Sequence, residues 1–283
     1  MDVNILGRID SILSSLPKAE KKIATVILNN PESVLNMTAT VLGKESNSSA
    51  ATVIRFCKRI GIPSFTQLKI LLSSEVSKPN SLGYSDITED ESAEDILDKI
   101  LGNTVQSLQD TISILNTESL TLAIEAIEKA SILYVFGVGA SFLVAENIAQ
   151  KFNRIGKTSI CYSDPHNFIP ALVGNQKNAC FIGISNSGET KEVIRLLDVA
   201  AESNLTTISM TRFGTNSLSS NATVSLQTVR ANEEKLRSAA TYSLHAQFLV
   251  VDVLFFMYAS KNYKSVMQNV KRSRNEIEKY NSK

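Results

Sequence analysis

Six consecutive residues in the second half of the chain carry a high density of hydrogen-bonding groups. The run Ser185-Asn186-Ser187-Gly188-Glu189-Thr190 lies between an apolar segment, Phe181–Ile184, and a helical pattern that begins at Lys191. Hydroxyls and the free N–H groups of a helix N-terminus both donate hydrogen bonds to an anion. A serine-rich helix cap would explain Ser187 or Thr190 but not the whole set. The run therefore predicts a cradle for a phosphate monoester.

A glycine-rich turn occurs earlier in the chain, also between an apolar segment and a helical pattern. Gly137 and Gly139 let the backbone turn tightly and approach a ligand, and Ser141 adds a hydroxyl. A dinucleotide fingerprint is the alternative, because Asp164 lies near the expected place of a ribose-binding acid. That fingerprint needs a further glycine near position 142, where Phe142 stands. The spacing favours a phosphate over a dinucleotide.

A basic helical segment in the first quarter of the chain suggests a different chemistry. An apolar stripe recurs at helical spacing over residues 49–60 and consists of Val53, Phe56, Cys57 and Ile60. Small residues and hydroxyls at the start of the other face suit close approach to DNA, and the basic side chains suit bases or phosphates. The predicted DNA contacts are Ser49, Ala50, Ala51, Thr52, Arg55, Lys58 and Arg59.

An ordinary amphipathic helix with a solvated basic face is the alternative for this segment. A short helix precedes it, capped by Thr38 and covering residues 39–44, and a polar turn at Asn47-Ser48 separates the two. That order favours a helix-turn-helix. Gly61 is expected to end the second helix, and Pro17 and Pro31 to mark helix boundaries upstream.

Short apolar segments alternate with helical patterns after residue 131. The predicted strands are Ile132–Phe136, Thr158–Tyr162, Cys180–Ile184, Thr206–Met210 and Ala222–Leu226. Such alternation is typical of βαβ units and of a parallel sheet covered on both faces. The carboxyl ends of neighbouring strands then bring the two polar turns into one crevice. His166, which follows the second strand, is a further residue that could line this crevice.

The predicted domains are residues 1–77, a polar linker at 78–92, an α/β domain with leading helices at 93–260, and a helical tail at 261–283. Residues 1–78 hold ten basic and six acidic side chains, whereas residues 79–283 hold nineteen and twenty-two. A basic front on a near-neutral body fits a nucleic-acid-binding head. The three cysteines are scattered, and we expect no disulfide, no metal site and no cofactor.

The first quarter of the chain resembles a known family. The segment ATVIRFCKRIGIPSFTQLK, residues 51–69, is similar to the signature of RpiR-type (MurR/RpiR) transcription regulators, and the likeness extends over residues 1–77. Ser48 stands where the family usually has an apolar turn residue, which is expected to loosen the turn slightly. Ala50 stands where it often has glutamate, which is expected to alter the operator that is read.

The two polar turns resemble those of the SIS, or phosphosugar-binding, domain over roughly residues 120–260. Its GxGxS turn matches Gly137, Gly139 and Ser141, and its S-x-S-G-E-T loop matches Ser185–Thr190. The resemblance implies a three-layer α/β fold with a five-stranded parallel, flavodoxin-like sheet. It implies phosphate contacts from Ser141, Ser185, Asn186, Ser187 and Thr190. Further possible effector contacts are Gly139, Ala140, His166 and Gly188.

SIS domains occur in isomerases as well as in regulators, so the fold alone does not decide the function. Aldose–ketose isomerisation needs a base, for which Glu233, Glu234 and His245 are conceivable, although we expect His245 to lie in the core. The attached helix-turn-helix favours a sensor without catalytic residues over an isomerase with a helical oligomerisation domain. We expect a cytoplasmic homo-oligomer that does not associate with a membrane. It is expected to repress a sugar-utilisation operon by binding a palindromic DNA duplex. A sugar phosphate is expected to relieve that repression.

Overall fold

The computed structural model describes residues 5–76, 90–174, 178–230 and 240–282, and it contains two compact units. The first unit comprises Met1–Ile114, Phe213–Thr215 and Val229–Ser243, and the second comprises the rest of the chain. Helix α7 therefore groups with the N-terminal helices, whereas the sequence prediction assigned it to the second domain. Most of the predicted linker, up to residue 89, lies outside the described residues.

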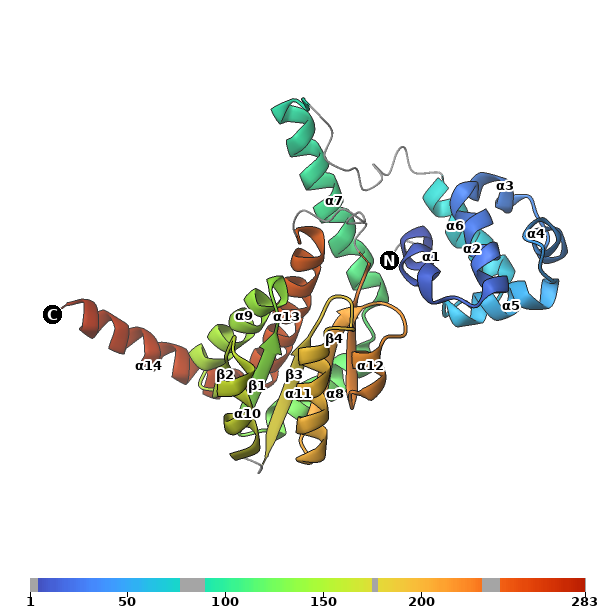
Figure 1. Cartoon of the computed structure of the whole chain (residues 1–283). Helices are drawn as coiled ribbons and strands as arrows, with labels where there is room; N and C mark the ends of the chain where they lie inside the picture. Colours follow the sequence, from blue (N-terminus) through green and yellow to red (C-terminus); the bar gives the residue numbers. More distant parts are fainter. Residues whose placement is uncertain (1–4, 77–89, 175–177, 231–239, 283) are drawn as a thin grey trace. The chain divides into compact units, whose positions relative to one another are not determined.

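The first unit is helical. Its elements are α1 (Ile5–Ile12), a 3-10 turn (Leu13–Ser15), α2 (Lys18–Asn29), α3 (Pro31–Leu35), α4 (Ala39–Glu45), α5 (Ala50–Arg59), α6 (Phe65–Val76) and α7 (Ala93–Ile114). The apolar stripe predicted on α5 is fully buried, and it packs against Ile23 and Ile27 of α2. Burying these side chains is what holds the short helices together, because helices of this length are marginal alone. Figure 1 shows α1 to α6 around this core.

Local capping fixes the ends of the two helices that form the helix-turn-helix. The Thr38 hydroxyl accepts a hydrogen bond from the Val41 N–H at 3.2 Å, and the Ser49 hydroxyl accepts one from the Thr52 N–H at 3.2 Å. Gly61 has a φ of +72° and ends α5. These three predictions from the sequence are confirmed.

Helix α7 has an inverted distribution of side chains. Its buried face is polar and consists of Asn103, Ser107, Asp110 and Thr111. Its apolar side chains are exposed instead, with Leu97 at 68% and Leu101 at 63%. An exposed apolar helix face of this kind is characteristic of a surface that associates with another protein.

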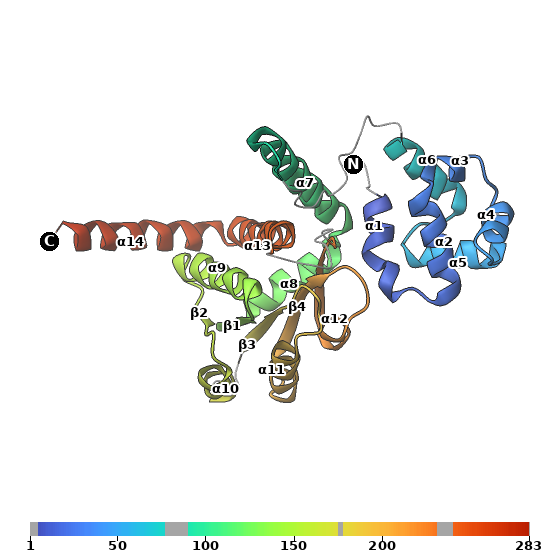
Figure 2. The same ribbon diagram turned by 45° about the horizontal axis from the view of Figure 1, so that its top comes forward.

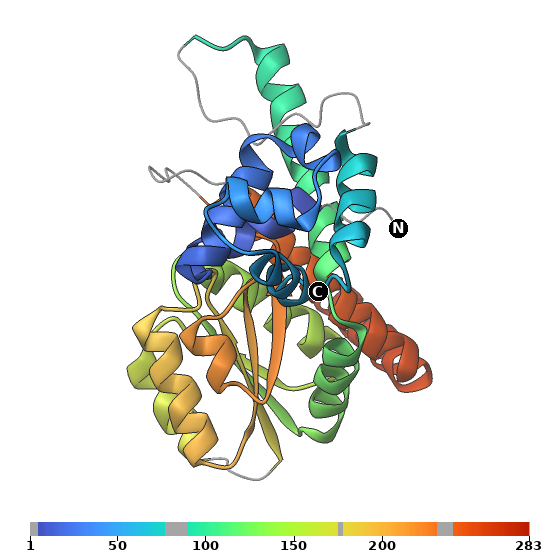
Figure 3. The same cartoon turned by 90° about the vertical axis from the view of Figure 1, so that its right-hand side faces the viewer.

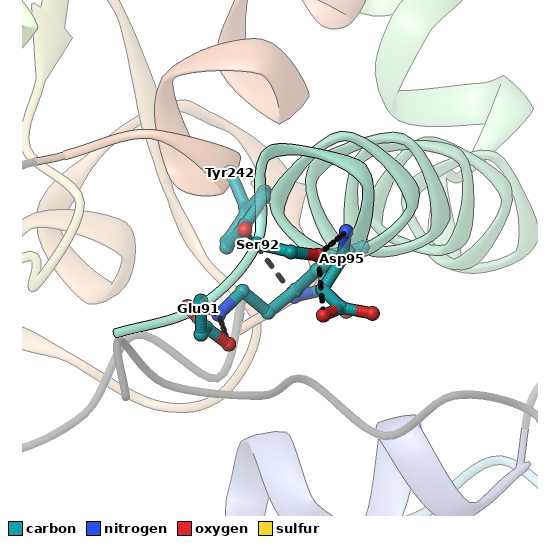
Figure 4. Close-up of polar contacts among 6 residues, drawn as sticks. Glu91, Ser92, Asp95 and Tyr242 are labelled. Atoms are coloured by element: carbon teal, nitrogen blue, oxygen red, sulfur yellow. Dashed lines mark hydrogen bonds and ion pairs between the residues drawn. The ribbon is translucent and has the colours of Figure 1, made fainter. Parts of the chain in front are cut away.

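Polar contacts hold the start and the middle of α7. The Ser92 hydroxyl caps the helix by accepting from the Asp95 N–H at 3.1 Å (Figure 4). Lys99 pairs with Glu91. Further along, the Asn103 amide donates to the Tyr242 hydroxyl at 3.2 Å. Buried polar groups need such partners, since an unpaired one costs about 1–3 kcal/mol.

The second unit is built on a parallel five-stranded sheet in the order β2-β1-β3-β4-β5. Its strands are β1 (Ile132–Gly137), β2 (Ser159–Cys161), β3 (Ala179–Ile184), β4 (Thr206–Arg212) and β5 (Val224–Thr228). This order is flavodoxin-like, so the predicted fold class is confirmed. The strand predicted at Ala222–Leu226 begins two residues later, because Ala222 ends the preceding helix.

Helices cover both faces of this sheet. They are α8 (Thr117–Lys129), α9 (Ala140–Arg154), α10 (Pro165–Gly174), α11 (Lys191–Glu202), α12 (Ser217–Asn221), α13 (Tyr242–Lys261) and α14 (Tyr263–Asn281). Core contacts place α8, α9 and α13 on one face, and α10, α11 and α12 on the other. Figure 2 shows these two layers, and in Figure 3 the gold α11 lies beside the orange α12. The sequence prediction did not specify α10.

By length and composition alone, helix α13 is long and apolar enough to cross a membrane. Val250, Val251 and Leu254 on this helix are buried in the core of the second unit, as expected for a core helix of a folded domain. His245 lies in the first turn of that helix and is half-buried, whereas the sequence prediction placed it in the core. The tail forms the exposed helix α14, as predicted.

Candidate nucleic-acid interface and anion site

The turn between α4 and α5 is tight. Asn47 adopts a φ of +47°, and a Cβ on Gly43 would lie 2.8 Å from the Ser49 carbonyl carbon. Only glycine lets the two helices approach this closely. The sequence prediction did not single out Gly43, although a glycine inside a short helix is the signal that could have identified it.

Ser48, the polar residue in this turn, has a hydrogen-bonding partner in α2. Its hydroxyl donates to the Ala19 carbonyl at 3.0 Å. The expected loosening of the turn is therefore offset by a bond that ties the turn to α2.

Most residues predicted to contact DNA lie at the surface of α5 or just before it. Ser49, Ala51, Arg55 and Lys58 are exposed, and Ala50 is half-buried. Thr52 is buried at 5% exposure, and its hydroxyl lies 2.9 Å from the Ser49 hydroxyl and accepts from Arg55 at 3.2 Å. Thr52 therefore holds Arg55 in position, and little of its own surface is exposed.

Arg59 has an intramolecular partner. Its Nε donates to a Glu20 carboxylate oxygen at 2.6 Å, and Glu20 is buried at 5% exposure. A buried carboxylate needs such a partner, because leaving it unpaired is costly. Arg59 therefore ties α5 to α2, and its exposed part remains available at the surface.

The glycine-rich turn joins β1 to α9 in the second unit. Gly139 adopts a φ of +60°, and a Cβ there would meet no atom within 4 Å. A Cβ on Gly137 would instead lie 2.5 Å from the Ser141 carbonyl oxygen, so this glycine is needed for the close turn. Ser141 lies in the first turn of α9 and is 9% exposed. The open backbone at Gly139 leaves room for a ligand.

The hydroxyls of the second turn, residues 185–190, bond to one another. The Ser185 Oγ lies 2.8 Å from the Thr190 Oγ1 and 3.4 Å from the Ser187 Oγ. The Ser185 Oγ also accepts from the Gly188 N–H at 3.1 Å, and the Ser187 Oγ accepts from the Glu189 N–H at 3.1 Å. We call residues 185–190 the phosphate loop. Its hydroxyls converge, and no side chain caps the N-terminus of α11 that follows.

The sheet register brings the two turns together. Gly137 at the end of β1 is the pairing partner of Ile184 at the end of β3. The turns that leave these strands therefore start side by side at the carboxyl edge of the sheet, which is where ligands bind in such folds. His166 is exposed in the first turn of α10, after β2, and β2 is the other neighbour of β1.

The phosphate loop is also held by residues that the sequence prediction missed. The Arg212 N–H donates to the Asn186 carbonyl at 3.0 Å, and the Leu218 N–H donates to the Gly188 carbonyl at 3.0 Å. Gly188 has a φ of +72°, and a Cβ there would collide with the Asn216 side chain. The capping box of Asn216 on α12 was a readable helix-start signal, but the sequence does not say that this helix meets the loop.

Glu189 completes this attachment. Its carboxylate accepts from the Ser217 hydroxyl at 2.6 Å and from the Ser217 N–H at 2.8 Å. These bonds lower the pKa of the Glu189 carboxyl, and the charge of Arg212 adds to the effect. Glu189 therefore points to α12 and anchors the loop, whereas the Asn186 Oδ1 is buried without a partner among the described residues.

The three cysteines are poor nucleophiles. Burial raises the pKa of the Cys57 thiol to about 11 and that of Cys180 to about 12. Burial and the charge of Glu146 raise the pKa of Cys161 to about 12. The thiolate is the reactive form, so these thiols are inert near neutral pH. A cavity of about 530 Å³ beside Cys161 is lined by α9, β2 and α13 residues and does not include the phosphate loop.

Comparisons with known proteins agree with this arrangement. Residues 3–79 match the family described as helix-turn-helix domain, rpiR family, and residues 126–257 match the SIS domain. The chain is 36% identical to the uncharacterized HTH-type transcriptional regulator YbbH of Bacillus subtilis, over 96% of each chain. It is 35% identical to an uncharacterized HTH-type transcriptional regulator of Caldanaerobacter subterraneus, over 94% of each chain.

A solved structure is similar over the whole chain. The NanR protein of Vibrio vulnificus, complexed with ManNAc-6P, is 28% identical and has a TM-score of 0.61. The similarity covers 97% of this chain and 98% of that one. Both domains are therefore found in the same order in that protein.

Proposed function

The chain belongs to the rpiR family of helix-turn-helix transcription regulators that carry a SIS domain, and on that premise we propose that it represses a sugar-utilisation operon under the control of a phosphorylated sugar. The observation that carries the proposal is the phosphate loop. Its convergent hydroxyls lie beside an open glycine turn, in a chain that also presents a basic recognition helix.

The DNA contacts of this proposal come from the outward face of α5. Arg55 and Lys58 supply charge for phosphates or base edges, and Ser49, Ala50 and Ala51 let the start of the helix approach the major groove. Thr52 orients Arg55, and Arg59 braces the helix through Glu20. Double-stranded DNA with a palindromic operator is the proposed partner.

The effector contacts come from the two turns at the edge of the sheet. The phosphate oxygens would accept hydrogen bonds from the hydroxyls of Ser141, Ser185, Ser187 and Thr190. The N–H groups at the start of α11 would donate further hydrogen bonds. Asn186 has a buried amide oxygen without a protein partner among the described residues, and it would accept a bond from the effector. Because NanR was solved with ManNAc-6P, amino-sugar phosphates are the first class to test.

A symmetric oligomer fits both parts of the proposal. The exposed apolar face of α7, with Leu97 and Leu101, supports association with a second copy of the chain. A two-fold dimer would place two recognition helices on a palindrome. The proposed site of action is the cytoplasm, where the operator lies.

We propose a regulator without catalytic turnover. Two of the bases considered for an isomerase, Glu233 and Glu234, lie outside the described residues, and the third, His245, is half-buried on α13. Incubation of the purified protein with aldose and ketose phosphates, followed by NMR, is expected to show no conversion. Conversion that is lost in Glu233→Gln would support an isomerase instead.

A thermal-shift screen of sugar phosphates tests the effector site directly. A compound that binds only the folded state raises the melting temperature, by an amount that grows with its concentration over Kd. We expect phosphorylated sugars to raise it and their unphosphorylated counterparts to have no effect. Equal shifts from both forms would contradict recognition of the phosphate.

A further inference from the structure

A short segment that leaves β4 belongs to both compact units. The strand ends at Arg212 in the second unit, Phe213–Thr215 belong to the first unit, and the chain returns to the second unit at Asn216. We call residues 212–218 the strap. The two ends of the strap therefore belong to the second unit, and its middle belongs to the first unit.

Both ends of the strap are bonded to the phosphate loop. Before the excursion, the Arg212 N–H donates to the Asn186 carbonyl at 3.0 Å. After it, Ser217 donates two bonds to the Glu189 carboxylate, at 2.6 and 2.8 Å. The Leu218 N–H adds a bond to the Gly188 carbonyl at 3.0 Å. A movement of the loop would therefore displace both ends of the strap.

The middle of the strap packs on the helix-turn-helix. Phe213 is half-buried against the apolar core of the first unit. The Arg8 guanidinium of α1 lies over the Phe213 ring, 5.5 Å from its centroid. A stacked arginine of this kind holds a defined position, because the planar cation is attracted to the ring face.

The same arginine reaches the end of the recognition helix. A Cβ on Gly61 would lie 2.5 Å from one Arg8 guanidinium nitrogen, so the guanidinium packs directly on the Gly61 backbone. Gly61 follows α5 and terminates it with a bond from its N–H to the Lys58 carbonyl at 3.0 Å. Arg8 therefore contacts both the strap and the C-terminal end of the helix proposed to read DNA.

We infer that the strap transmits occupancy of the phosphate loop to the recognition helix through Phe213 and Arg8. This inference rests on the proposed function of the loop. A phosphate would take the hydroxyls of Ser185 and Thr190 from their mutual bond, which changes the loop that Glu189 and Gly188 connect to the strap. The effect on DNA binding requires that phosphate bind the two strap positions unequally.

Amide hydrogen exchange on the full chain is the first test. Inorganic phosphate and N-acetylmannosamine 6-phosphate are the probes, and chloride at equal ionic strength is the control. Binding is expected to change exchange in peptides that cover residues 185–190, 213–217, 5–12 and 58–62. In Phe213→Ala, the change at 185–190 is expected to remain, and the changes at 5–12 and 58–62 to disappear.

Tyr162→Ala is the matched control variant. Tyr162 is also an aromatic residue just after a strand, but it packs on Phe168 of the second unit. It is expected to leave the changes at 5–12 and 58–62 intact. Arg8→Gln interrupts the same route from the other side, so it keeps the inference testable if Phe213→Ala folds poorly.

DNA titration provides the functional readout. The probe is a duplex that the protein selects from a random-sequence pool, titrated with and without saturating N-acetylmannosamine 6-phosphate. Allosteric coupling typically changes affinity roughly 5- to 150-fold, and we expect a change in this range for the parent and Tyr162→Ala. Phe213→Ala and Arg8→Gln are expected to lose it, and the double variant to lose no more than either single one.

The outcomes separate the two proposals. If neither probe changes exchange at 185–190 or binds by calorimetry, the proposed effector site is wrong and the strap has nothing to transmit. If binding occurs and the change at 58–62 persists in both Phe213→Ala and Arg8→Gln, the strap is not the route. The phosphate site would then stand without it.

Discussion

The recognition helix α5 and the phosphate loop are both polar surfaces, but they are held in opposite ways. Helix α5 is held in place by an apolar stripe that is fully buried in the core of its unit, so most of its exposed side chains contribute little to the stability of the fold. The phosphate loop is fixed by its own polar groups, which bond to one another and to the strap. The two surfaces should therefore respond differently to the loss of one side chain.

The largest effect is expected behind α5. Phe56 is completely buried in the core of the helix-turn-helix, and Phe56→Ala should destabilise this unit by about 3–5 kcal/mol. Urea denaturation followed by circular dichroism measures the loss. The neighbouring Arg55→Ala is the control, since an exposed substitution usually changes stability by less than about 0.5 kcal/mol. A comparable loss in both variants would contradict the separation of core and surface.

The phosphate loop should lose stability and binding together. Ser185 is 2% exposed, and its hydroxyl both accepts from the Gly188 N–H and faces Thr190. Ser185→Ala removes a bond to a charged ligand, worth about 1.5–3 kcal/mol or roughly ten- to a hundredfold in affinity. Calorimetry with N-acetylmannosamine 6-phosphate measures this loss of affinity. Ser203→Ala, at the far end of α11, should bind normally.

The exposed face of α5 should lose binding without losing stability. Arg55→Ala and Lys58→Ala are each expected to lower the slope of log affinity against log salt by about 1, because each contact to a DNA phosphate releases a counterion. Titrations at several salt concentrations measure the slope. Lys44→Ala, an exposed lysine on the preceding helix, is the comparison variant. An unchanged slope in the Arg55/Lys58 double variant would remove α5 from the interface.

The smallest effect concerns pH. The hydrogen bonds from Ser217 lower the pKa of Glu189, so their stabilisation is fully present above the unfolded pKa of about 4.5 and is lost as the pH falls through the lower folded value. Glu189→Gln should therefore differ more from the parent at pH 7 than at pH 3. The exposure of Glu189 keeps the difference small. Paired denaturation curves at both pH values measure it, and a gap that widens in acid would oppose this assignment.

Much of the fold followed from local patterns. The stripe on α5, the caps at Thr38 and Ser49, and the alternation of strands and helices all depend on residues within one or two turns of each other. The phosphate loop was equally readable, because a strand, a cluster of hydroxyls and a helix start are adjacent in the chain. The helices and strands among these features were predicted at the correct residues, apart from shifts at strand ends such as Val224, and phosphate binding by the loop stays a prediction.

Other features could not be read in this way. The Arg59–Glu20 pair joins residues 39 positions apart, so the sequence held no sign that this predicted DNA contact also ties α5 to α2. Thr52 was expected to contact DNA, but only 5% of its surface is exposed in the folded unit. Leu97 and Leu101 of α7 are exposed, which the sequence did not reveal. Apolar periodicity identifies a helix face but does not say what covers that face.

The sequence by itself determined which segments form helices and strands, and which residues carry donors for an anion or charge for DNA, since periodicity and local capping are properties of neighbouring residues. Only the tertiary structure decided how those donors are held. Gly188 and Glu189 meet Asn216 and Ser217 because β4 lies beside β3 in the sheet, which brings the exit of β4 to the loop. The pairing of strands is a choice among distant segments, and its energy comes from burial and hydrogen bonds that form only when the chain has folded.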